Sequence, residues 1–452
     1  MDRFRKLFFR RTSYEPLEDV ADPRGVDDEL PDIAAPPPSE FSWIDFTVFL
    51  LLGNSMLWAW NMFLAATPYF RGRFDSNEWT LKNFQSSIIS VFSITNLICV
   101  LALAKLQKNA SYPKRITLSL FLNVAVFCIL AVSTSSAFSS VSSKGYFGFL
   151  MVMVFGASAA TGTNQNGVYS YCSGFNNGAY TQAVMIGQGI AGVLPGIIQI
   201  ASVLAIPERK EVDEAAKKEA SSSAFIFFMT AAGVSAATLI AFAYLMRRHK
   251  SLAALKLLNN SEDEQETPSL EEKRSIPLWT IFKKLPSIAL AILICFLFTM
   301  MYPVFTGRIE SVQDGPKAPR LFHSDTFIPF AFLAWNIGDL IGRVSPSIPQ
   351  VRLSRYPWAL LLIAIARAGF FPLYLLCNID GRGAVVKSDA FYLIVIQIPF
   401  GILNGYLNSS CMMEAPQFVA DDEKEATGGF MSFMLVTGLT SGSLLSFSLG
   451  EI

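Results

Sequence analysis

Long apolar stretches recur along the whole chain, and they restrict the possible folds more than any other feature of the sequence. About 20 apolar residues are enough for a helix to cross the hydrocarbon core of a bilayer. We count eleven such stretches, and the predicted spans are 43–66, 82–104, 116–137, 146–171, 179–205, 223–246, 278–305, 325–345, 357–377, 389–413 and 427–449. The alternating segments of an outer-membrane barrel are absent. The sequence therefore predicts an all-α, polytopic membrane protein with eleven transmembrane helices.

The composition agrees with a membrane protein and argues against several other classes. Hydrophobic residues make up 52% of the chain and charged residues only 16%, whereas soluble domains usually carry about 25% charged residues. The formal net charge of +0 argues against a nucleic-acid-binding protein. The two histidines, His249 and His323, have no second histidine or cysteine at metal-ligand spacing. We therefore predict neither a metal site nor a cofactor.

The longest polar connection divides six spans from five. We predict four regions, which are a disordered cytosolic tail at 1–42, an amino-terminal six-helix bundle at 43–246, a cytosolic linker at 247–277 and a carboxy-terminal five-helix bundle at 278–452. Two bundles that flank a linker are typical of transporters built from parallel repeats. Lysines and arginines gather in the tail and in the loops after the second, sixth and eighth spans. The positive-inside rule therefore predicts a cytosolic N-terminus.

An aspartate and an arginine lie one helical turn apart within the eighth span. Asp339 and Arg343 stand at positions i and i+4, so they share a helix face, and Asn336 lies close to the same face. Ionisable groups in lipid cost roughly 2.5–3.5 kcal/mol each on insertion scales and usually face a cavity or a partner. The pair therefore predicts a polar path through the protein. The alternative is an interfacial anchor whose arginine reaches the headgroups.

Two further residues could contact a flat, polar ligand. Gln165 lies between two asparagines in the fourth span, and an amide offers the mixture of donors and acceptor that suits a heteroaromatic base. The alternative for this amide is hydrogen bonding between helices. Trp60 lies deep in the first span, away from the interfacial belt that tryptophan usually occupies. It could form a stacking wall for a ligand, or belong to the core.

Other residues within the spans favour structural roles. Arg367 lies in the middle of the ninth span and needs a partner. We name Glu414, near the end of the tenth span, as a candidate for a structural or gating ion pair with it. Gly192 and Gly196 in the fifth span form a small-xxx-small face that predicts close approach of another helix.

Taken in order, these motifs resemble the equilibrative nucleoside transporter family across nearly all of the spans. The residues that carry the resemblance include Trp60-Asn61, Ala66-Thr67-Pro68-Tyr69-Phe70, Gln165-Asn166-Gly167-Val168-Tyr169, Gly187-Gln188-Gly189, Asn336 to Arg343, Arg367 with Phe370-Phe371-Pro372, and Ala415-Pro416-Gln417. The resemblance, which suggests a fungal intracellular or vacuolar member, implies a major-facilitator-like fold split six plus five. It also implies alternating access with nucleosides held between the bundles.

The resemblance also implies roles for individual residues. By position, Gln165 would meet the base, and Asp339 and Arg343, beside Asn336, would meet the ribose hydroxyls. The apolar wall would consist of Leu57, Trp60 and Leu64. Separately from the resemblance, we predict structural or gating roles for Asn61, Tyr302, Pro303, Arg367 and Glu414. The chain departs from many relatives in having Ala59 where a proline is common, which leaves fine substrate preference open.

Three hypotheses follow for the function. The first is a carrier of nucleosides, with nucleobases as further candidate substrates. The second is a proton-coupled carrier of another polar solute that uses Asp339 as the proton site. The third is a signalling or structural membrane protein whose polar groups only join helices. No nucleotide-binding loop, nucleophile elbow or HExxH motif occurs, so we do not predict an enzyme. The predicted partners are nucleosides and the bilayer, with protons as a candidate, and nucleic acid is not among them.

The sequence restricts the membrane of residence only weakly. Tyr14-Glu15-Pro16-Leu17 matches a tyrosine-based sorting pattern of low specificity. We therefore predict a multi-pass protein of either a vacuolar or endolysosomal membrane or the plasma membrane.

Overall fold

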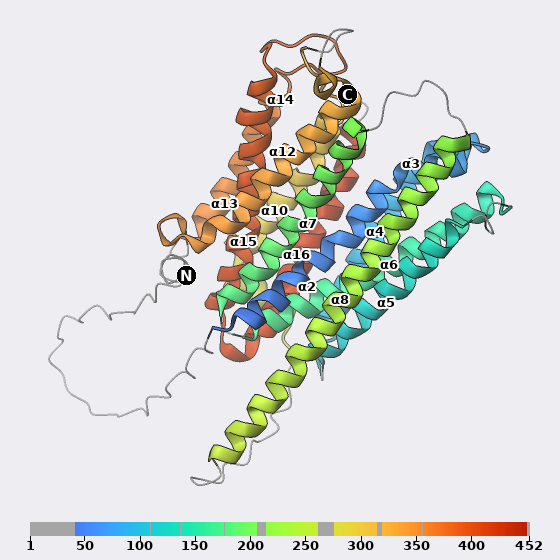
Figure 1. The fold of residues 1–452 in the computed structure, drawn as a ribbon. Helices are drawn as coiled ribbons and strands as arrows, with labels where there is room; N and C mark the ends of the chain where they lie inside the picture. Colours follow the sequence, from blue (N-terminus) through green and yellow to red (C-terminus); the bar gives the residue numbers. More distant parts are fainter. Residues whose placement is uncertain are drawn as a thin grey trace.

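The computed structural model describes residues 41–449 except 109, 136–137, 139, 176, 206–213, 261–274, 314–318 and 354–355. In this part of the chain, eleven helical segments are long and apolar enough to cross a membrane (Figure 1). The prediction of an all-α protein with eleven spans is therefore confirmed. The predicted tail lies outside the described residues up to residue 40.

Two groups of helices form the molecule. The first comprises α2 (Trp43–Ala65), its continuation α3 (Thr67–Phe74), α4 (Glu78–Lys105), α5 (Tyr112–Ser133), α6 (Ser143–Ser173), α7 (Gly178–Ala205) and α8 (Glu214–Asn260). The second comprises α9 (Leu278–Lys284), α10 (Pro286–Met301), α11 (Pro303–Thr306), α12 (Ser324–Val344), α13 (Pro357–Ala366), α14 (Phe370–Tyr374), a π-helix (Phe391–Gln397), α15 (Ile398–Glu414) and α16 (Lys424–Leu449). We call them the amino-terminal and the carboxy-terminal bundle.

The sixth span is longer than predicted. We expected residues 223–246, but α8 runs from Glu214 to Asn260 and projects beyond the other helices (Figure 1). The first residues of the predicted linker are therefore helical. A drop in hydropathy ends a membrane span, but it does not end the helix when the following residues are good helix formers. Arg248 and His249 also attach this part of α8 to the start of α2. Their Nη1 and Nε2 atoms lie 2.5 and 3.0 Å from the carboxylate of Asp45.

Glycines allow helices to pack at backbone distance. A Cβ at Gly187 on α7 would overlap the carbonyl oxygen of Leu50 on α2. The predicted small-residue face is confirmed as well, since Gly192 faces Asn336 and Gly196 faces Leu333, both on α12. Such contacts favour association in lipid, where no hydrophobic effect drives helices together.

Two side chains bond to carbonyls that prolines leave free. Pro195 lies inside α7 and has no N–H for the carbonyl of Ala191, four residues earlier. Asn61 Nδ2 on α2 donates to that oxygen at 2.7 Å. In the ninth span, Pro372 similarly has no N–H for the carbonyl of Ala368, and the hydroxyl of Tyr302 lies 3.3 Å from this oxygen and 3.3 Å from the carbonyl oxygen of Arg367. One side chain from each bundle therefore stabilises a proline-interrupted helix.

The two bundles meet at one end of the molecule and along its middle. We call this end, where α2 begins, the Trp43 face. Here Gln182 Nε2 on α7 donates to the carbonyls of Arg343 and Val344 at 3.2 Å each. A Cβ at Gly428 on α16 would overlap the carbonyl of Tyr169 on α6. Towards the opposite end, α3, α4, α5 and α8 diverge from α12 and α14 (Figure 1).

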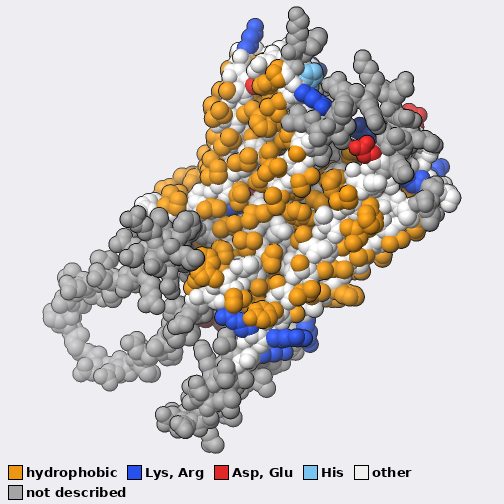
Figure 2. Space-filling model, viewed as in Figure 1, with side chains coloured by type: hydrophobic (Ala, Val, Ile, Leu, Met, Phe, Trp, Pro, Cys, Tyr) orange, Lys and Arg blue, Asp and Glu red, His pale blue; other side chains and the backbone are white. Residues whose placement is uncertain are grey.

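On the face shown in Figure 2, hydrophobic side chains cover most of the surface between the two ends. Ile98, Leu118, Phe155 and Ile240 are each more than half exposed. Contiguous apolar patches of this kind mark surfaces that water does not cover. The protein is therefore an integral, multi-pass membrane protein that presents this surface to lipid.

Candidate functional site

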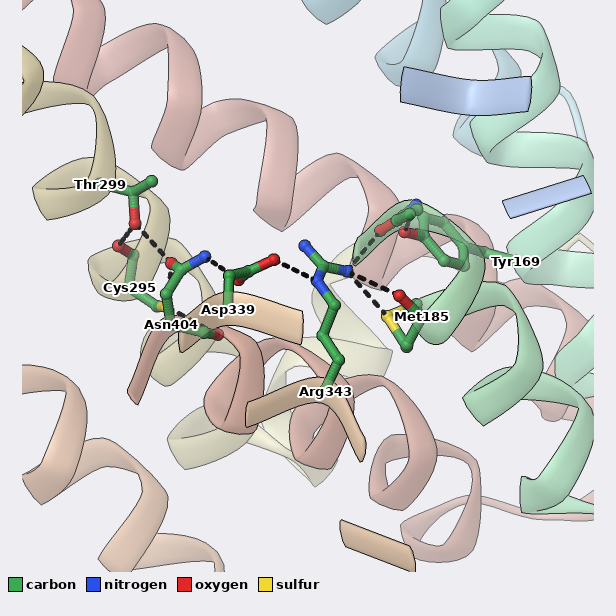
Figure 3. Close-up of polar contacts among 8 residues, drawn as sticks. Tyr169, Met185, Cys295, Thr299, Asp339, Arg343 and Asn404 are labelled. Atoms are coloured by element: carbon green, nitrogen blue, oxygen red, sulfur yellow. Dashed lines mark hydrogen bonds and ion pairs between the residues drawn. The ribbon is translucent and has the colours of Figure 1, made fainter. Parts of the chain in front are cut away.

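The acidic and basic residues of the eighth span form an ion pair inside the molecule (Figure 3). Arg343 Nε lies 2.5 Å from Asp339 Oδ2 on the same helix, α12. Each residue is only 4% exposed. The alternative of an interfacial anchor is therefore wrong, since the arginine points towards other helices and not towards the headgroups.

On one side, the pair connects to the core of the carboxy-terminal bundle. Asn404 Nδ2 on α15 donates to Asp339 Oδ1 at 2.7 Å. The amide oxygen of Asn404 lies 2.6 Å from Thr299 Oγ1 on α10. Arg367 Nη2 donates to the same hydroxyl at 3.2 Å. Both carboxylate oxygens of Asp339 thus have donors, and the aspartate is held in place from two helices.

On the other side, the pair reaches the amino-terminal bundle. Arg343 Nη1 donates to Gln188 Oε1 on α7 at 2.8 Å. Gln188 Nε2 donates in turn to the hydroxyl of Tyr169 on α6 at 2.6 Å. With its amide oxygen towards the guanidinium, Asn408 accepts from Nη1 and Nη2 at 3.0 and 3.2 Å. Arg343 is therefore a polar connection between the bundles.

This arrangement can bind a polar solute that carries hydroxyl groups. A carboxylate accepts hydroxyl protons and a guanidinium donates to hydroxyl oxygens. The described residues contain no group of three or more His, Cys, Asp or Glu side chains that could hold a metal ion. The polar chemistry of the site thus comes from side-chain amides, hydroxyls and one ion pair.

Gln165 belongs to a separate group of amides in the amino-terminal bundle. Asn96 Nδ2 on α4 lies 3.4 Å from its amide oxygen, and Asn164 Nδ2 lies 3.5 Å from Ser55 Oγ on α2. The amide oxygens of Asn96 and Asn164 are buried without a hydrogen-bond partner among the described residues. Buried polar atoms rarely remain unpaired. Because these two oxygens have no partner here, each can accept a hydrogen bond from a further donor.

The residues expected to form an apolar wall lie in different environments. The ring of Trp60 packs against Phe92, with centroids 4.4 Å apart. Leu57 is half-buried, whereas Leu64 is 48% exposed. Asn336 bonds to the carbonyl of Phe332 in its own helix at 2.9 Å and faces Gly192. Asn336 thus contributes to helix packing in this conformation.

The predicted pairing of Arg367 with Glu414 is wrong. Arg367 is fully buried, and its Nη1 donates to the carbonyl of Cys295 at 2.7 Å. Its guanidinium also lies 4.2 Å from the ring centroid of Phe400. A carbonyl, a hydroxyl and an aromatic face stabilise this cation in place of a carboxylate, and its Nε has no hydrogen-bond partner among the described residues. Glu414 instead lies 3.4 Å from Arg352 at the Trp43 face.

Several residues of the polar chain were not predicted from the sequence. They are Tyr169, Gln188, Thr299, Asn404 and Asn408. Asn404 and Asn408 are one helical turn apart in an apolar span, which is the same signal that identified Asp339 and Arg343. Gln188 lies between two glycines of the fifth span, where the sequence favoured packing alone.

Comparisons with known proteins point to one family. A family model described as nucleoside transporter matches residues 149–450. The nucleoside transporter FUN26 of Saccharomyces cerevisiae is 27% identical over 447 residues, covering 89% of this chain and 83% of the relative. Equilibrative nucleoside transporter 1 of Mus musculus is 28% identical over 463 residues, covering 89% and 96%.

Solved structures share the architecture at low identity. The major facilitator superfamily transporter FucP, in the outward conformation, superposes with a TM-score of 0.55 at 14% identity, covering 90% of this chain and 97% of FucP. The human organic anion transporter MFSD10 gives 0.54 at 14% identity, covering 91% and 93%. The predicted major-facilitator-like fold is therefore confirmed, and this fold and the matched family are those of membrane transporters, not of enzymes.

Proposed function

Because the chain belongs to the nucleoside transporter family, we propose that it moves nucleosides across its membrane by alternating access. In this proposal, Asp339 and Arg343 bind the ribose and Gln165 lies near the base. The observation that carries the proposal is the buried ion pair between Asp339 and Arg343, which lies where α12 meets α7 of the other bundle. A substrate at this point touches both bundles and can influence how they move.

The ribose end of the proposed site follows from hydrogen-bonding chemistry. Two neighbouring hydroxyls can donate to the carboxylate of Asp339 and accept from the guanidinium of Arg343. Asn404 and Gln188 position the pair from opposite sides. Both oxygens of Asp339 already accept from donors, which suits a fixed countercharge. This favours the nucleoside carrier over the alternative in which Asp339 binds and releases a proton to drive another solute.

The base end of the proposed site is supported by the free amide oxygens. Asn96 and Asn164, next to Gln165, leave oxygens that can accept from the ring or amino N–H groups of a base. Trp60 supplies an aromatic face with Leu57 nearby in sequence, and a flat base can stack on it. Leu64 would join this wall only after a change in helix packing, because it is exposed here.

We propose that alternating access proceeds by rocking of the bundles about the middle of the molecule. The contacts of Gln182 with Arg343 and Val344 hold the Trp43 face closed in this conformation. Asn61, Tyr302 and the break before Pro303 would serve as structural or gating positions, because Asn61 bonds to a carbonyl beside a proline of α7 and the other two lie where the seventh span is interrupted.

A competition panel tests the two ends of the site separately. Uptake of labelled uridine is measured with adenosine, guanosine, uridine and cytidine as competitors, for wild type and Gln165→Ala. We expect Gln165→Ala to weaken the four nucleosides unequally, since an unmatched buried polar edge costs about 1–3 kcal/mol, or roughly tenfold to a hundredfold in affinity. Asp339→Ala, which we expect to lose uptake, is compared by binding of the four labelled nucleosides to the purified protein, and binding of all four should be weakened.

A second buried glutamine provides the matched control. Gln397 donates to the hydroxyl of Tyr392 at 2.6 Å, within the carboxy-terminal bundle and away from Gln165. Gln397→Ala should leave the order of the four competitors unchanged. An equal loss for all four nucleosides in Gln165→Ala, or no loss, would show that Gln165 only joins helices.

A further inference from the structure

Glu414 is a buried carboxylate with only half of its hydrogen-bonding capacity used. It is 3% exposed and is the last residue of α15. Its Oε1 lies 3.4 Å from Arg352 Nε, and its Oε2 has no hydrogen-bond partner among the described residues. A buried charge normally needs close pairing and full hydrogen bonding. The environment of Glu414 provides neither.

Other buried or half-buried acids of the protein show the contrast. Asp339 accepts bonds at both of its oxygens. Glu423 also lies at the Trp43 face, and both of its oxygens accept from Lys284 Nζ, at 2.6 and 2.5 Å. Glu414 also ends its helix, where the last carbonyls carry partial negative charge and oppose a carboxylate. Protonation of Glu414 would remove its negative charge and, with it, the repulsion by the last carbonyls of the helix.

The immediate neighbours of Glu414 lie where the two bundles meet. The Met413 methyl group lies 3.5 Å from the position of a Cβ at Gly178, the first residue of α7, and Arg352 Nη2 lies 3.9 Å from the same position. The start of α7 therefore contacts Met413, the sequence neighbour of Glu414, and the guanidinium of Arg352, whose side chain is 37% exposed. A cavity of about 380 Å³ opens beside it, lined by both bundles, including Met413, Gly178, Thr181 and Gln417.

Few other groups bear on the charge of Glu414. Arg352, from the loop after α12, is its ion-pair partner. Tyr406 and Cys411 lie on the same helix and are titratable, but both are neutral near pH 7 in their ordinary state. The first turn of α7, from Gly178 to Thr181, contains no charged residue. On α16, Lys424 lines the cavity as well and forms an ion pair with Asp421.

We propose that Glu414 is a proton-binding site of the Trp43 face. It holds a proton while the bundles are closed there and releases it to water when they part. The site rests on the proposed alternating-access function. Acid on this side then stabilises the closed face and slows transport. The proton enters and leaves on the same side, so transport responds to pH without carrying a proton across the membrane.

Transport at different pH values tests the site. Nucleoside uptake into liposomes is measured from about pH 5 to about pH 7.5, a range that covers an ordinary or raised carboxyl. Wild-type uptake should rise with pH, by at most about tenfold per unit for one proton. Glu414→Gln resembles the protonated acid, so its uptake should stay at the slow, acid-like rate at every pH. Arg352→Gln should move the midpoint to higher pH, because the favourable charge beside the carboxylate is lost.

The matched control is Glu423→Gln, at the same face but with a complete ion pair in the wild type. It should keep the pH response of the wild type. The proposal is overturned if wild-type uptake does not change with pH, or if Glu414→Gln keeps the wild-type response.

A second measurement does not depend on transport. Infrared difference spectra of the purified protein should contain the carbonyl band of a protonated carboxyl group, which disappears as the pH rises and is missing in Glu414→Gln. With the band present but no uptake of any nucleoside, the proton site stands and the proposed function fails. Absence of the band from the wild type rejects the proton site.

Discussion

Asp339 has two buried partners at once, and this makes its removal costly. Arg343 would remain buried at 4% exposure without its countercharge in Asp339→Ala. Breaking such a pair typically costs about 3–5 kcal/mol. We predict that Asp339→Ala inserts into the membrane but loses nucleoside uptake, measured in proteoliposomes alongside its thermal midpoint.

The ion pair between Arg308 and Asp380 provides the control for this substitution. It lies in a loop region, and Asp380 is about one-third exposed at its side chain. Asp380→Ala removes a carboxylate from a pair that water screens, so its uptake should stay close to that of wild type. Near-normal uptake by Asp339→Ala would show that Asp339 does not bind the ribose.

Gln188 carries the connection from Arg343 to the other bundle. Its oxygen accepts from Arg343 at 2.8 Å, and its nitrogen donates to Tyr169 at 2.6 Å. A hydrogen bond to a charged group contributes about 1.5–3 kcal/mol. We predict that Gln188→Leu lowers nucleoside affinity by roughly tenfold to a hundredfold. Tyr169→Phe leaves the bond to Arg343 intact and should have the smaller effect in the same competition assay. A larger loss of affinity in Tyr169→Phe than in Gln188→Leu would assign the connection between the bundles to Tyr169.

At the scale of residues, the sequence identified the charged groups that are costly to place in lipid, but not the residues with which they pair. Asp339 and Arg343 were identifiable because charges in an apolar span need an explanation. The partner of Arg367 was predicted wrongly, because the sequence shows charges but not the carbonyl of Cys295 or the ring of Phe400. Gln188 was missed because an amide between two glycines suits packing as well as a site.

At the scale of elements, the interrupted helices depend on side chains from neighbouring helices. The hydroxyl of Tyr302 lies 3.3 Å from the carbonyl oxygens of Arg367 and Ala368, and Pro372 has no N–H for the second of these. We predict that Tyr302→Phe lowers the free energy of unfolding by about 0.5–1.5 kcal/mol, the usual net value of one hydrogen bond. The phenylalanine keeps the aromatic packing against Phe400.

A double-mutant cycle isolates this bond. In Pro372→Ala, the helix regains an N–H that can bond to the carbonyl of Ala368, so adding Tyr302→Phe should cost less, and the cost that remains reflects the bond to the carbonyl of Arg367. Thermal unfolding in detergent measures the four proteins of the cycle. Equal costs of Tyr302→Phe in both backgrounds would show that the hydroxyl does not act through the freed carbonyl.

The element boundaries show what periodicity and hydropathy can predict. The fifth span was expected at 179–205, and α7 runs from Gly178 to Ala205. The helix of the sixth span was predicted too short, because hydropathy marks where the membrane-spanning part of a helix ends and not where the helix itself ends. The π-helical start of the tenth span, Phe391–Gln397, has no signal in the apolar pattern.

At the scale of the whole molecule, the predicted orientation places the Trp43 face in the cytosol. The chain has three Asn-x-Ser/Thr sequences, at Asn109, Asn259 and Asn408. Asn109 lies outside the described residues, Asn259 lies in the extension of α8, and Asn408 is fully buried. We predict no N-linked glycan, since none of these sequences would reach a glycosylating lumen.

Deglycosidase treatment followed by gel electrophoresis checks the orientation. A glycosylation sequence inserted after Val385, which is 77% exposed, serves as the positive control. The control protein should lose a glycan and the wild type should not change in mobility. A shift in the wild type would contradict the predicted orientation.

Counterflow in liposomes tests most directly the central claim, that the two bundles carry nucleosides past the Asp339–Arg343 pair. Liposomes containing the purified protein are loaded with unlabelled uridine and diluted into labelled uridine. A carrier with alternating access should accumulate label transiently above its equilibrium level, and Asp339→Ala should not. If loading makes no difference to uptake by the wild type, or if correctly inserted wild-type protein takes up no nucleoside, the account is wrong.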